Sequence, residues 1–189
     1  MRKLFSAVLY TALAFGANAQ TADMPSPDRA ALEALRSGDM QKLVFSEEPQ
    51  PVPKAILLDA EGAEHDLSEY AGRYVLLNFW ATWCAPCRAE LGSLDRLEAA
   101  HGGDRFAVVT VATGPNPVPA IRKLFEEEGI TRLPILRDTR QQFARSMGVL
   151  GLPISVILDP EGREIGRLIG DAVWDSPEAQ AIIAALIGG

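Results

Sequence analysis

The stretch NFWATWCAPCRAEL, residues 78–91, determines how this chain of 189 residues folds. It holds the only two cysteines of the sequence, Cys84 and Cys87, in a C-x-x-C spacing. A nearly continuous apolar run, YVLLNFW (74–80), precedes the pair, as expected for a strand buried on both faces. A helix is predicted to follow over residues 85–101. The two cysteines therefore lie where a buried strand passes into a helix.

This position gives Cys84 a particular chemistry. At a helix N-terminus, a sulfur lies near unpaired backbone N–H groups and the positive end of the helix dipole, which stabilise the thiolate and lower the thiol pKa. Cys84 is therefore the candidate nucleophile. Cys87, about one turn further along, is placed to attack a mixed disulfide and release the product. Pro86 suits the first helical turn, where its missing N–H is not needed. The pair predicts a reversible two-electron switch.

Three other roles of the cysteine pair compete with redox catalysis. A zinc site needs two further ligands, but no other cysteine exists and the two histidines, His65 and His101, are far apart in the sequence. A copper carrier would have a His or Met cluster beside the pair, and none is present. A purely structural disulfide would close a loop of a few residues and constrain the unfolded chain little. We predict redox catalysis, with no metal and no cofactor beyond the cysteines.

Strand and helix patterns alternate along the rest of the chain. Helices are predicted over 26–40 (begun by Ser26, Pro27 and Asp28), 117–130, 139–149 and from 176 onward. Hairpins are predicted around 61–62 and over 154–169, and strands over 105–112 and 133–136. The segment SEEPQPVP (46–53) is interpreted as a linker. This order predicts an α/β fold, with a mixed central sheet between helices.

The stretches FWATWCAPC (79–87) and GLPISVILDPEG (151–162) together resemble the TlpA/ResA/CcmG-type exported thiol–disulfide oxidoreductases of the thioredoxin superfamily, the TlpA branch most of all. The resemblance covers residues 51–189 and implies a thioredoxin-like fold. It further implies a central strand–helix insertion over roughly 105–130 and an N-terminal helical extension. We accordingly divide the chain into a signal peptide (1–19), an extension with a short helix and a linker (20–50), and a thioredoxin-like domain (51–189).

The resemblance implies roles for individual residues. Cys84 would attack and Cys87 would resolve the mixed disulfide. Pro153 would be the cis-proline that faces the sulfurs, and the backbone beside it, at Leu152, would pair with an extended substrate segment. Further substrate contacts are expected from Trp83, Ala85 and Pro86.

Trp80 has two interpretations, and Asn78 and Gly92 depart from the family pattern. Trp80 is as well explained by core packing as by function. Asn78 stands where thioredoxin has a buried aspartate, and the group instead implicates an acidic residue three positions after the second cysteine, here Glu90. We hypothesise that Glu90 helps to deprotonate Cys87; the alternative is a solvated helix glutamate. Gly92 replaces a common proline and leaves the helix geometry there in doubt.

The residues between the cysteines, Ala85 and Pro86, resemble the Gly-Pro of reducing thioredoxins, which predicts a reductant. Its clients would be exported proteins with paired cysteines, such as copper-site assembly factors, oxidase subunits or apocytochromes c. The resemblance implies a membrane electron donor of the CcdA/DsbD type. Two alternatives stay open: a peroxiredoxin-like peroxide reductase, and a non-catalytic binding or chaperone module for metal or haem protein assembly. A monomer is expected.

The first residues read as an export signal. Two basic residues, an apolar run (4–17) and the small residues ANA (17–19) predict cleavage before Gln20 and a periplasmic protein. The alternative is an uncleaved anchor over 4–17 in the inner membrane. The net charge is −7, and cleavage would leave 16 basic against 25 acidic residues, a net charge of −9. Such a balance argues against nucleic acid and anionic membrane surfaces as partners.

Overall fold

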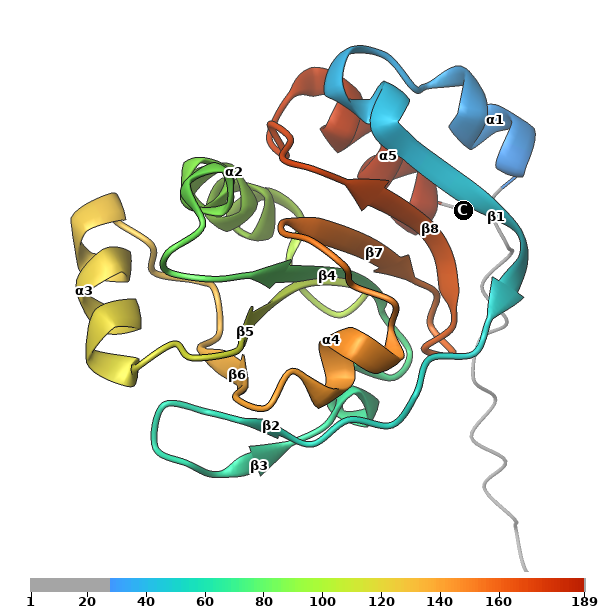
Figure 1. The fold of residues 1–189 in the computed structure, drawn as a ribbon. Coiled ribbons are helices and arrows are strands. Elements are labelled where there is room, and N and C mark those ends of the chain that lie inside the picture. The colour runs from blue at the N-terminus through green and yellow to red at the C-terminus, as the bar shows by residue number, and fades with distance from the viewer. Residues whose placement is uncertain (1–27, 189) are drawn as a thin grey trace, which may run out of the picture.

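A mixed sheet of eight strands forms the centre of the computed structural model, which describes residues 28–188 (Figure 1). Its strand order is β1-β8-β7-β4-β5-β6-β2-β3. The strands are β1 (Leu43–Gln50), β2 (Leu57–Leu58), β3 (Glu64–His65), β4 (Tyr74–Trp80), β5 (Phe106–Thr113), β6 (Leu136–Asp138), β7 (Ile154–Leu158) and β8 (Glu164–Ile169). The predicted signal peptide, the anchor alternative and the Ser26–Pro27 helix start lie outside the described residues.

Helices cover both faces of this sheet. The α-helices are α1 (Arg29–Ala34), α2 (Ala85–His101), α3 (Val118–Glu128), α4 (Gln142–Ser146) and α5 (Pro177–Ile187), and the short 3-10 helices are η1 (Gly38–Lys42) and η2 (Leu67–Tyr70). Between residues 28 and 188, no helix has the length and apolarity that crossing a bilayer requires. The predicted mixed sheet between helices is confirmed.

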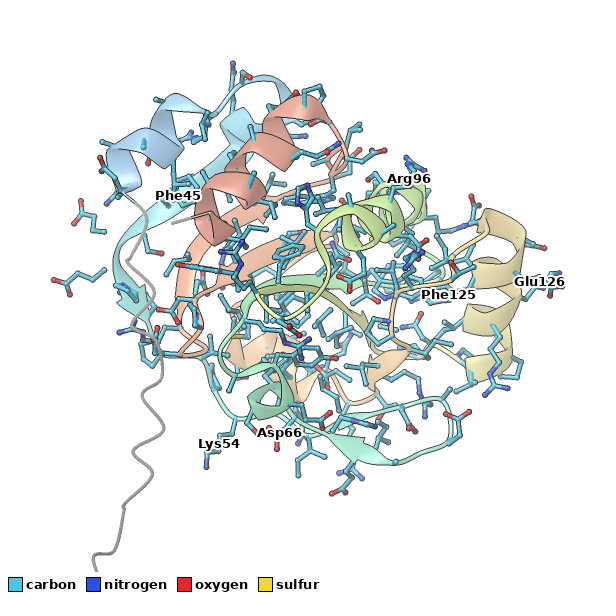
Figure 2. The ribbon with its side chains drawn as sticks, turned by 180° about the vertical axis from the view of Figure 1, so that it is seen from behind. Phe45, Lys54, Asp66, Arg96, Phe125 and Glu126 are labelled. Carbon is cyan, nitrogen blue, oxygen red and sulfur yellow. A yellow bond between two sulfur atoms is a disulfide. The ribbon has the colours of Figure 1, made fainter. Side chains whose placement is uncertain are left out.

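Strand β4 lies at the centre because its side chains, apart from Asn78, are apolar or aromatic on both faces. It pairs with β5 in parallel and with β7 antiparallel, and all seven of its residues are buried. Leu76 and Trp80 belong to the core beneath α2, α3 and α5, whereas Leu77 and Phe79 belong to the second core, which α4 covers. Figure 2 shows Phe125, on α3, near the edge of the first core. The sheet thus holds the start of α2 in a fixed place.

Helix α2 follows β4 after a four-residue connection and runs without a break to His101, where Gly102 caps it. Leu91, Leu94 and Leu97 recur at helical spacing and are fully buried against the sheet. Gly92 lies inside this helix and does not interrupt it. The doubt that Gly92 raised about the helix geometry is therefore removed, because the buried leucines hold the helix across the glycine.

The linker predicted over 46–53 is wrong for residues 46–50, which belong to strand β1. This strand pairs antiparallel with β8, and its residues Leu43 and Phe45 point into the core while Val44 is exposed. Phe45, labelled in Figure 2, belongs to the same core as Leu32 of α1 and Met40 of η1. The polar residues that suggested a linker instead suit an edge strand, where charges and a proline block pairing with another chain.

Other element boundaries also differ from the sequence prediction. The single helix expected over 26–40 is two, α1 and η1, and Asp28 caps α1 by accepting a hydrogen bond from the N–H of Ala30 (3.0 Å). Strand β6 begins at Leu136 rather than at residue 133, because Pro134 has no N–H for a ladder. Helix α4 covers only Gln142–Ser146 of the range expected over 139–149.

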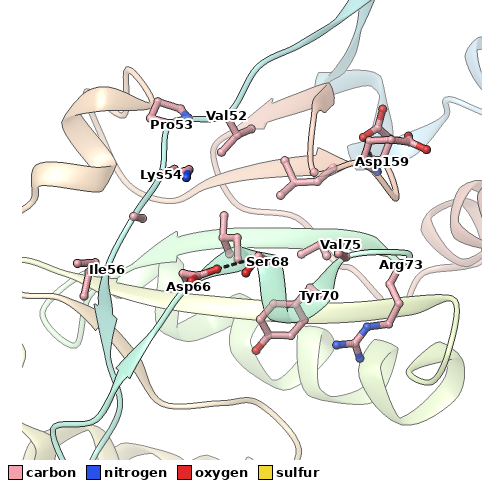
Figure 3. Close-up of a pocket in the computed structure, with 16 residues that line it drawn as sticks. Val52, Pro53, Lys54, Ile56, Asp66, Ser68, Tyr70, Arg73, Val75 and Asp159 are labelled. Atoms are coloured by element: carbon pink, nitrogen blue, oxygen red, sulfur yellow. Dashed lines mark hydrogen bonds between the residues drawn. The ribbon is translucent and has the colours of Figure 1, made fainter.

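A pocket of about 590 Å³ lies at the end of the sheet where β4 begins and β7 ends (Figure 3). Val75 and Leu158 form part of its floor, and Tyr70 and Arg73 stand at its side, with the arginine over the tyrosine ring at 4.9 Å. Because Cys84 follows the other end of β4, this pocket is separate from the cysteine pair.

Candidate active site

The two cysteines form a disulfide at the N-terminus of α2. Cys84 is the N-cap residue, and the backbone N–H of Cys87 donates to its sulfur at 3.3 Å. Cys84 retains 6% of its surface, whereas Cys87 is completely buried. Of the two residues, Cys84 is therefore the one that reaches the surface. Pro86 occupies the first helical turn, as predicted. The order of reaction inferred from the sequence agrees with this difference in access.

The segment before β7 reaches the same end of the sheet. The Leu152–Pro153 peptide bond is cis, as the resemblance implied. Ile154 pairs with Phe79, so Pro153 lies level with Trp80, the last residue of β4. Leu152 is half-buried and packs against both cores. The structure thus brings the predicted cis-proline and the disulfide to one end of the central strands.

The two tryptophans of the motif have different environments. Trp80 is buried and stacks on Phe125 of α3 with ring centroids 5.8 Å apart, which favours the packing interpretation. Trp83, immediately before Cys84, keeps 62% of its surface exposed. Ala85 and Pro86 are exposed as well. An exposed large aromatic residue directly before Cys84 is available for contact with a protein partner.

Glu90 lies inside the protein, so it is not the solvated helix glutamate of the alternative interpretation. Only 2% of its surface is exposed. Its Oε1 accepts from the side-chain amide of Asn78 at 2.7 Å, and its Oε2 accepts from the N–H of Ala172 at 3.1 Å and the indole N–H of Trp174 at 3.3 Å. Glu90 follows Cys87 by three residues, which places both on the same side of α2.

Burial raises the pKa of Glu90 from its ordinary value of 4.5 to about 7, because the charged form is separated from water. The hydrogen bonds from Asn78, Ala172 and Trp174 oppose this rise, since they stabilise the carboxylate, and the negative charge of Asp171 adds to it. A carboxyl with a pKa near neutrality can accept a proton at one stage of a reaction and release it at the next. Cys87 lies three residues earlier on the same helix and is also buried, so it is the thiol about one helical turn from this carboxyl.

Sequence reasoning missed several residues that support this site. Asn116, buried between two prolines, accepts hydrogen bonds from the backbone N–H (2.7 Å) and the hydroxyl (3.0 Å) of Thr82. It thereby fixes the connection that leads to Cys84. Ser155 on β7 receives a hydrogen bond from Asn78 at 2.9 Å. An asparagine between prolines signals a loop, but the partner that it binds, 34 residues away, leaves no mark in the sequence.

A thioredoxin-like fold, with a disulfide at the start of the helix after its central strand and a cis-proline at the same end, is the class that these features define. Residues 49–163 match the model of the AhpC/TSA family. The chain therefore belongs to the AhpC/TSA family.

Similar proteins of known name agree with this class. The chain is 35% identical over 111 residues to the thiol-disulfide oxidoreductase ResA of Geobacillus thermodenitrificans (strain NG80-2), which covers 59% of this chain and 63% of that relative. It is 33% identical over 124 residues to the thioredoxin-like protein YneN of Bacillus subtilis (strain 168), covering 65% and 71%. The alignment with ResA thus spans less than two thirds of that relative's length.

A crystal structure of a putative thiol:disulfide interchange protein DsbE from Chlorobium tepidum is similar in fold, with a TM-score of 0.64 and 27% identity. The similarity covers 74% of this chain and 98% of that one. The predicted thioredoxin-like fold is confirmed.

Proposed function

We propose that this protein is a thiol–disulfide oxidoreductase that reduces disulfides in other proteins through Cys84 and Cys87. The observation that carries the proposal is a disulfide at a helix N-terminus in which the two residues are unequally exposed: Cys84 retains 6% of its surface and Cys87 none. The names of the relatives, a thiol-disulfide oxidoreductase and a thiol:disulfide interchange protein, support it. Such chemistry needs no cofactor beyond the cysteines.

The reaction begins from the reduced dithiol. The Cys84 thiolate, stabilised by the helix N-terminus and by the N–H of Cys87, attacks one sulfur of a client disulfide. A mixed disulfide forms between Cys84 and the client, and the other client sulfur leaves as a thiolate that takes a proton from water. Trp83 and the backbone at Leu152, beside Pro153, would hold the client segment during this step.

The second step resolves the mixed disulfide. Glu90 accepts the proton of the Cys87 thiol, and the resulting thiolate attacks the sulfur of Cys84. The Cys84–client bond breaks, the client leaves as a thiolate and is protonated, and the Cys84–Cys87 disulfide remains. The client has gained two electrons and two protons. Since the carboxyl has a pKa of about 7, a substantial fraction of Glu90 is ionised at neutral pH and can act as this base.

The protein must then be reduced again by a dithiol donor. We propose that it works after export, in the periplasm, on proteins with paired cysteines such as copper-site assembly factors, oxidase subunits or apocytochromes c. The donor would be a membrane protein of the CcdA/DsbD type. The export signal in residues 1–19 and the Ala-Pro pair between the cysteines support the location and the reducing direction.

Mixed-disulfide trapping tests the function directly. We expect the Cys87→Ser variant to accumulate a covalent complex with a disulfide-containing test protein such as insulin, since its second step is blocked. The matched Cys84→Ser variant should form no such complex, because Cys87 is buried. Equal trapping by both variants, or by neither, contradicts the proposal. A strongly oxidising reduction potential in a redox titration would contradict the proposed direction of electron transfer, from this protein to its client. Peroxide consumption by Cys84 alone would favour the peroxide reductase alternative.

A further inference from the structure

Residues 171–174, between β8 and α5, form a segment that we call the strap. Two of its residues, Ala172 and Trp174, donate hydrogen bonds to side chains of α2. The N–H of Ala172 donates to Glu90 at 3.1 Å, and the backbone N–H of Trp174 donates to the hydroxyl of Ser93 at 3.0 Å. The indole of Trp174 adds a bond to Glu90 at 3.3 Å. Ala172 and Trp174 are both buried. The strap therefore covers one side of the Glu90 carboxyl and supplies two of its donors.

The other two strap residues are bonded to η1, in the N-terminal extension. The N–H of Val173 donates to the carboxylate of Asp39 at 3.1 Å, and the ammonium of Lys42 donates to the carbonyl oxygen of Asp171 at 2.5 Å. Asp39 and Lys42 also form an ion pair at 3.0 Å. Alternate residues of the strap are thus held from opposite sides, by η1 and by α2.

The local geometry of η1 explains why both of these side chains reach the strap. A 3-10 helix has three residues per turn, so side chains at positions i and i+3 lie above one another. Asp39 and Lys42 have this spacing. Met40, between them, is completely buried in the first core, and Leu43, immediately after η1, is 1% exposed. The core therefore fixes η1, and η1 presents an anion and a cation to the strap.

We propose that Asp39 and Lys42 are positioning residues for Glu90, acting through the strap. The inference rests on the proposed function, in which Glu90 moves the proton of Cys87. It assigns to the N-terminal extension a part in tuning that proton transfer. Both residues lie before residue 49, where the match to the family model begins. This part of the site is therefore built by the extension.

The expected effect on Glu90 has a definite sign. Two kinds of change compete when the strap loosens: loss of the Ala172 and Trp174 donors raises the pKa of Glu90, and entry of water lowers it. Burial is the largest cause of the raised pKa. Water that enters also donates hydrogen bonds to the carboxylate in place of the lost donors, so water entry has the larger effect and the pKa falls toward 4.5. The charged group acting on Glu90 from the strap itself is Asp171, whose repulsion also weakens as the strap moves away.

The test follows the Glu90 carboxyl itself. Carbon-13 NMR of the oxidised full chain, labelled at glutamate carboxyls, gives its titration, and loss of one resonance in Glu90→Gln assigns the signal. We expect the pKa in an Asp39→Ala, Lys42→Ala double variant, which removes both hydrogen bonds from η1 to the strap, to be lower than in the wild type by about half a unit or more. The pH profile of client release from the mixed disulfide should move to lower pH with it.

A double variant of Glu61→Ala and Arg122→Ala is the matched control, because it removes an exposed ion pair of 2.5 Å elsewhere on the surface. It should leave the Glu90 titration unchanged. If the first double variant does not fold, Asp39→Ala alone, which removes the acceptor of the Val173 N–H, carries the same test. An unchanged pKa of Glu90 in a folded variant overturns the inference. Normal turnover of Glu90→Gln refutes instead the proton-transfer role of Glu90, and leaves the titration result standing.

Discussion

Replacing Glu90 by glutamine removes the ionisable carboxyl and keeps its shape. The side-chain oxygen of glutamine can take the place of Oε2, which accepts from Ala172 and Trp174. The amide of Asn78 can turn so that its Oδ1, which has no hydrogen-bond partner among the described residues, accepts from the new NH2 group. The hydroxyl of Ser155 can then donate rather than accept. The variant therefore keeps the same number of hydrogen bonds, with the Asn78 NH2 group turned to the place where Oδ1 had no partner.

The magnitude follows from the pKa of Glu90, which is 4.5 ordinarily and about 7 in the fold. Between these pH values the folded protein binds more protons than the unfolded chain, so its stability falls as the pH rises. Each pKa unit corresponds to about 1.4 kcal/mol, so ionisation of Glu90 lowers the free energy of unfolding by about 3 kcal/mol above neutral pH. Glutamine cannot ionise and escapes this loss.

Urea unfolding of the oxidised proteins at about pH 4.5 and about pH 8 measures the effect. We expect the advantage of Glu90→Gln over the wild type to grow by about 3 kcal/mol between the two pH values. Other titrating groups contribute equally to both proteins and cancel in the difference. If the difference between the two proteins is the same at both pH values, Glu90 is not raised in pKa by burial and the reasoning about the proton transfer fails.

Three further substitutions test other parts of the structure. Phe45→Ala should lower the free energy of unfolding by about 3–5 kcal/mol in a chemical unfolding experiment, since it opens a cavity in the core; a change below about 0.5 kcal/mol would mean that this segment is not packed on the sheet. Asn116→Ala should lower the free energy of unfolding by about 1–3 kcal/mol, because two donors of Thr82 lose their acceptor. Stopped-flow measurements should also show slower thiol–disulfide exchange between Cys84 and a client. Unchanged exchange rates would mean that Asn116 does not support the site. Trp83→Ala should change stability by no more than about 0.5 kcal/mol, yet reduce mixed-disulfide trapping in the Cys87→Ser background. Full trapping there would remove Trp83 from the client surface.

The parts of the fold that were predictable from the sequence are those that local patterns specify. The apolar run of β4 and the leucines of α2 predicted both elements with correct boundaries. A strand buried on both faces shows a continuous apolar run in the sequence, and a helix buried on one face shows apolar residues at helical spacing. The turn of Asp159 and Gly162 likewise marked the β7–β8 hairpin. Around Cys84 and Cys87, the motif and its position at a helix start were sufficient to indicate the chemistry.

The rest depended on contacts between distant segments. Strand β1 contains Glu47, Glu48 and Pro49, which read as a linker locally, and only pairing with β8 makes the segment a strand. The Glu90 environment depends on residues more than 80 positions later, Ala172 and Trp174. A single glutamate on an otherwise mixed helix face is compatible with a solvated or a buried position. The helix pattern alone therefore does not predict that Glu90 is buried, because its burial depends on the strap that packs against it.

Strand β1 has a consequence for anyone who shortens this protein. A fragment that starts at residue 51, the boundary drawn from the sequence, would lose the partner of β8 and leave that strand as the new margin of the sheet. Its free N–H and C=O groups would then be available to a second molecule, which favours edge-to-edge association and precipitation. Functional dissection of the cysteine pair is better done by point substitution than by truncation.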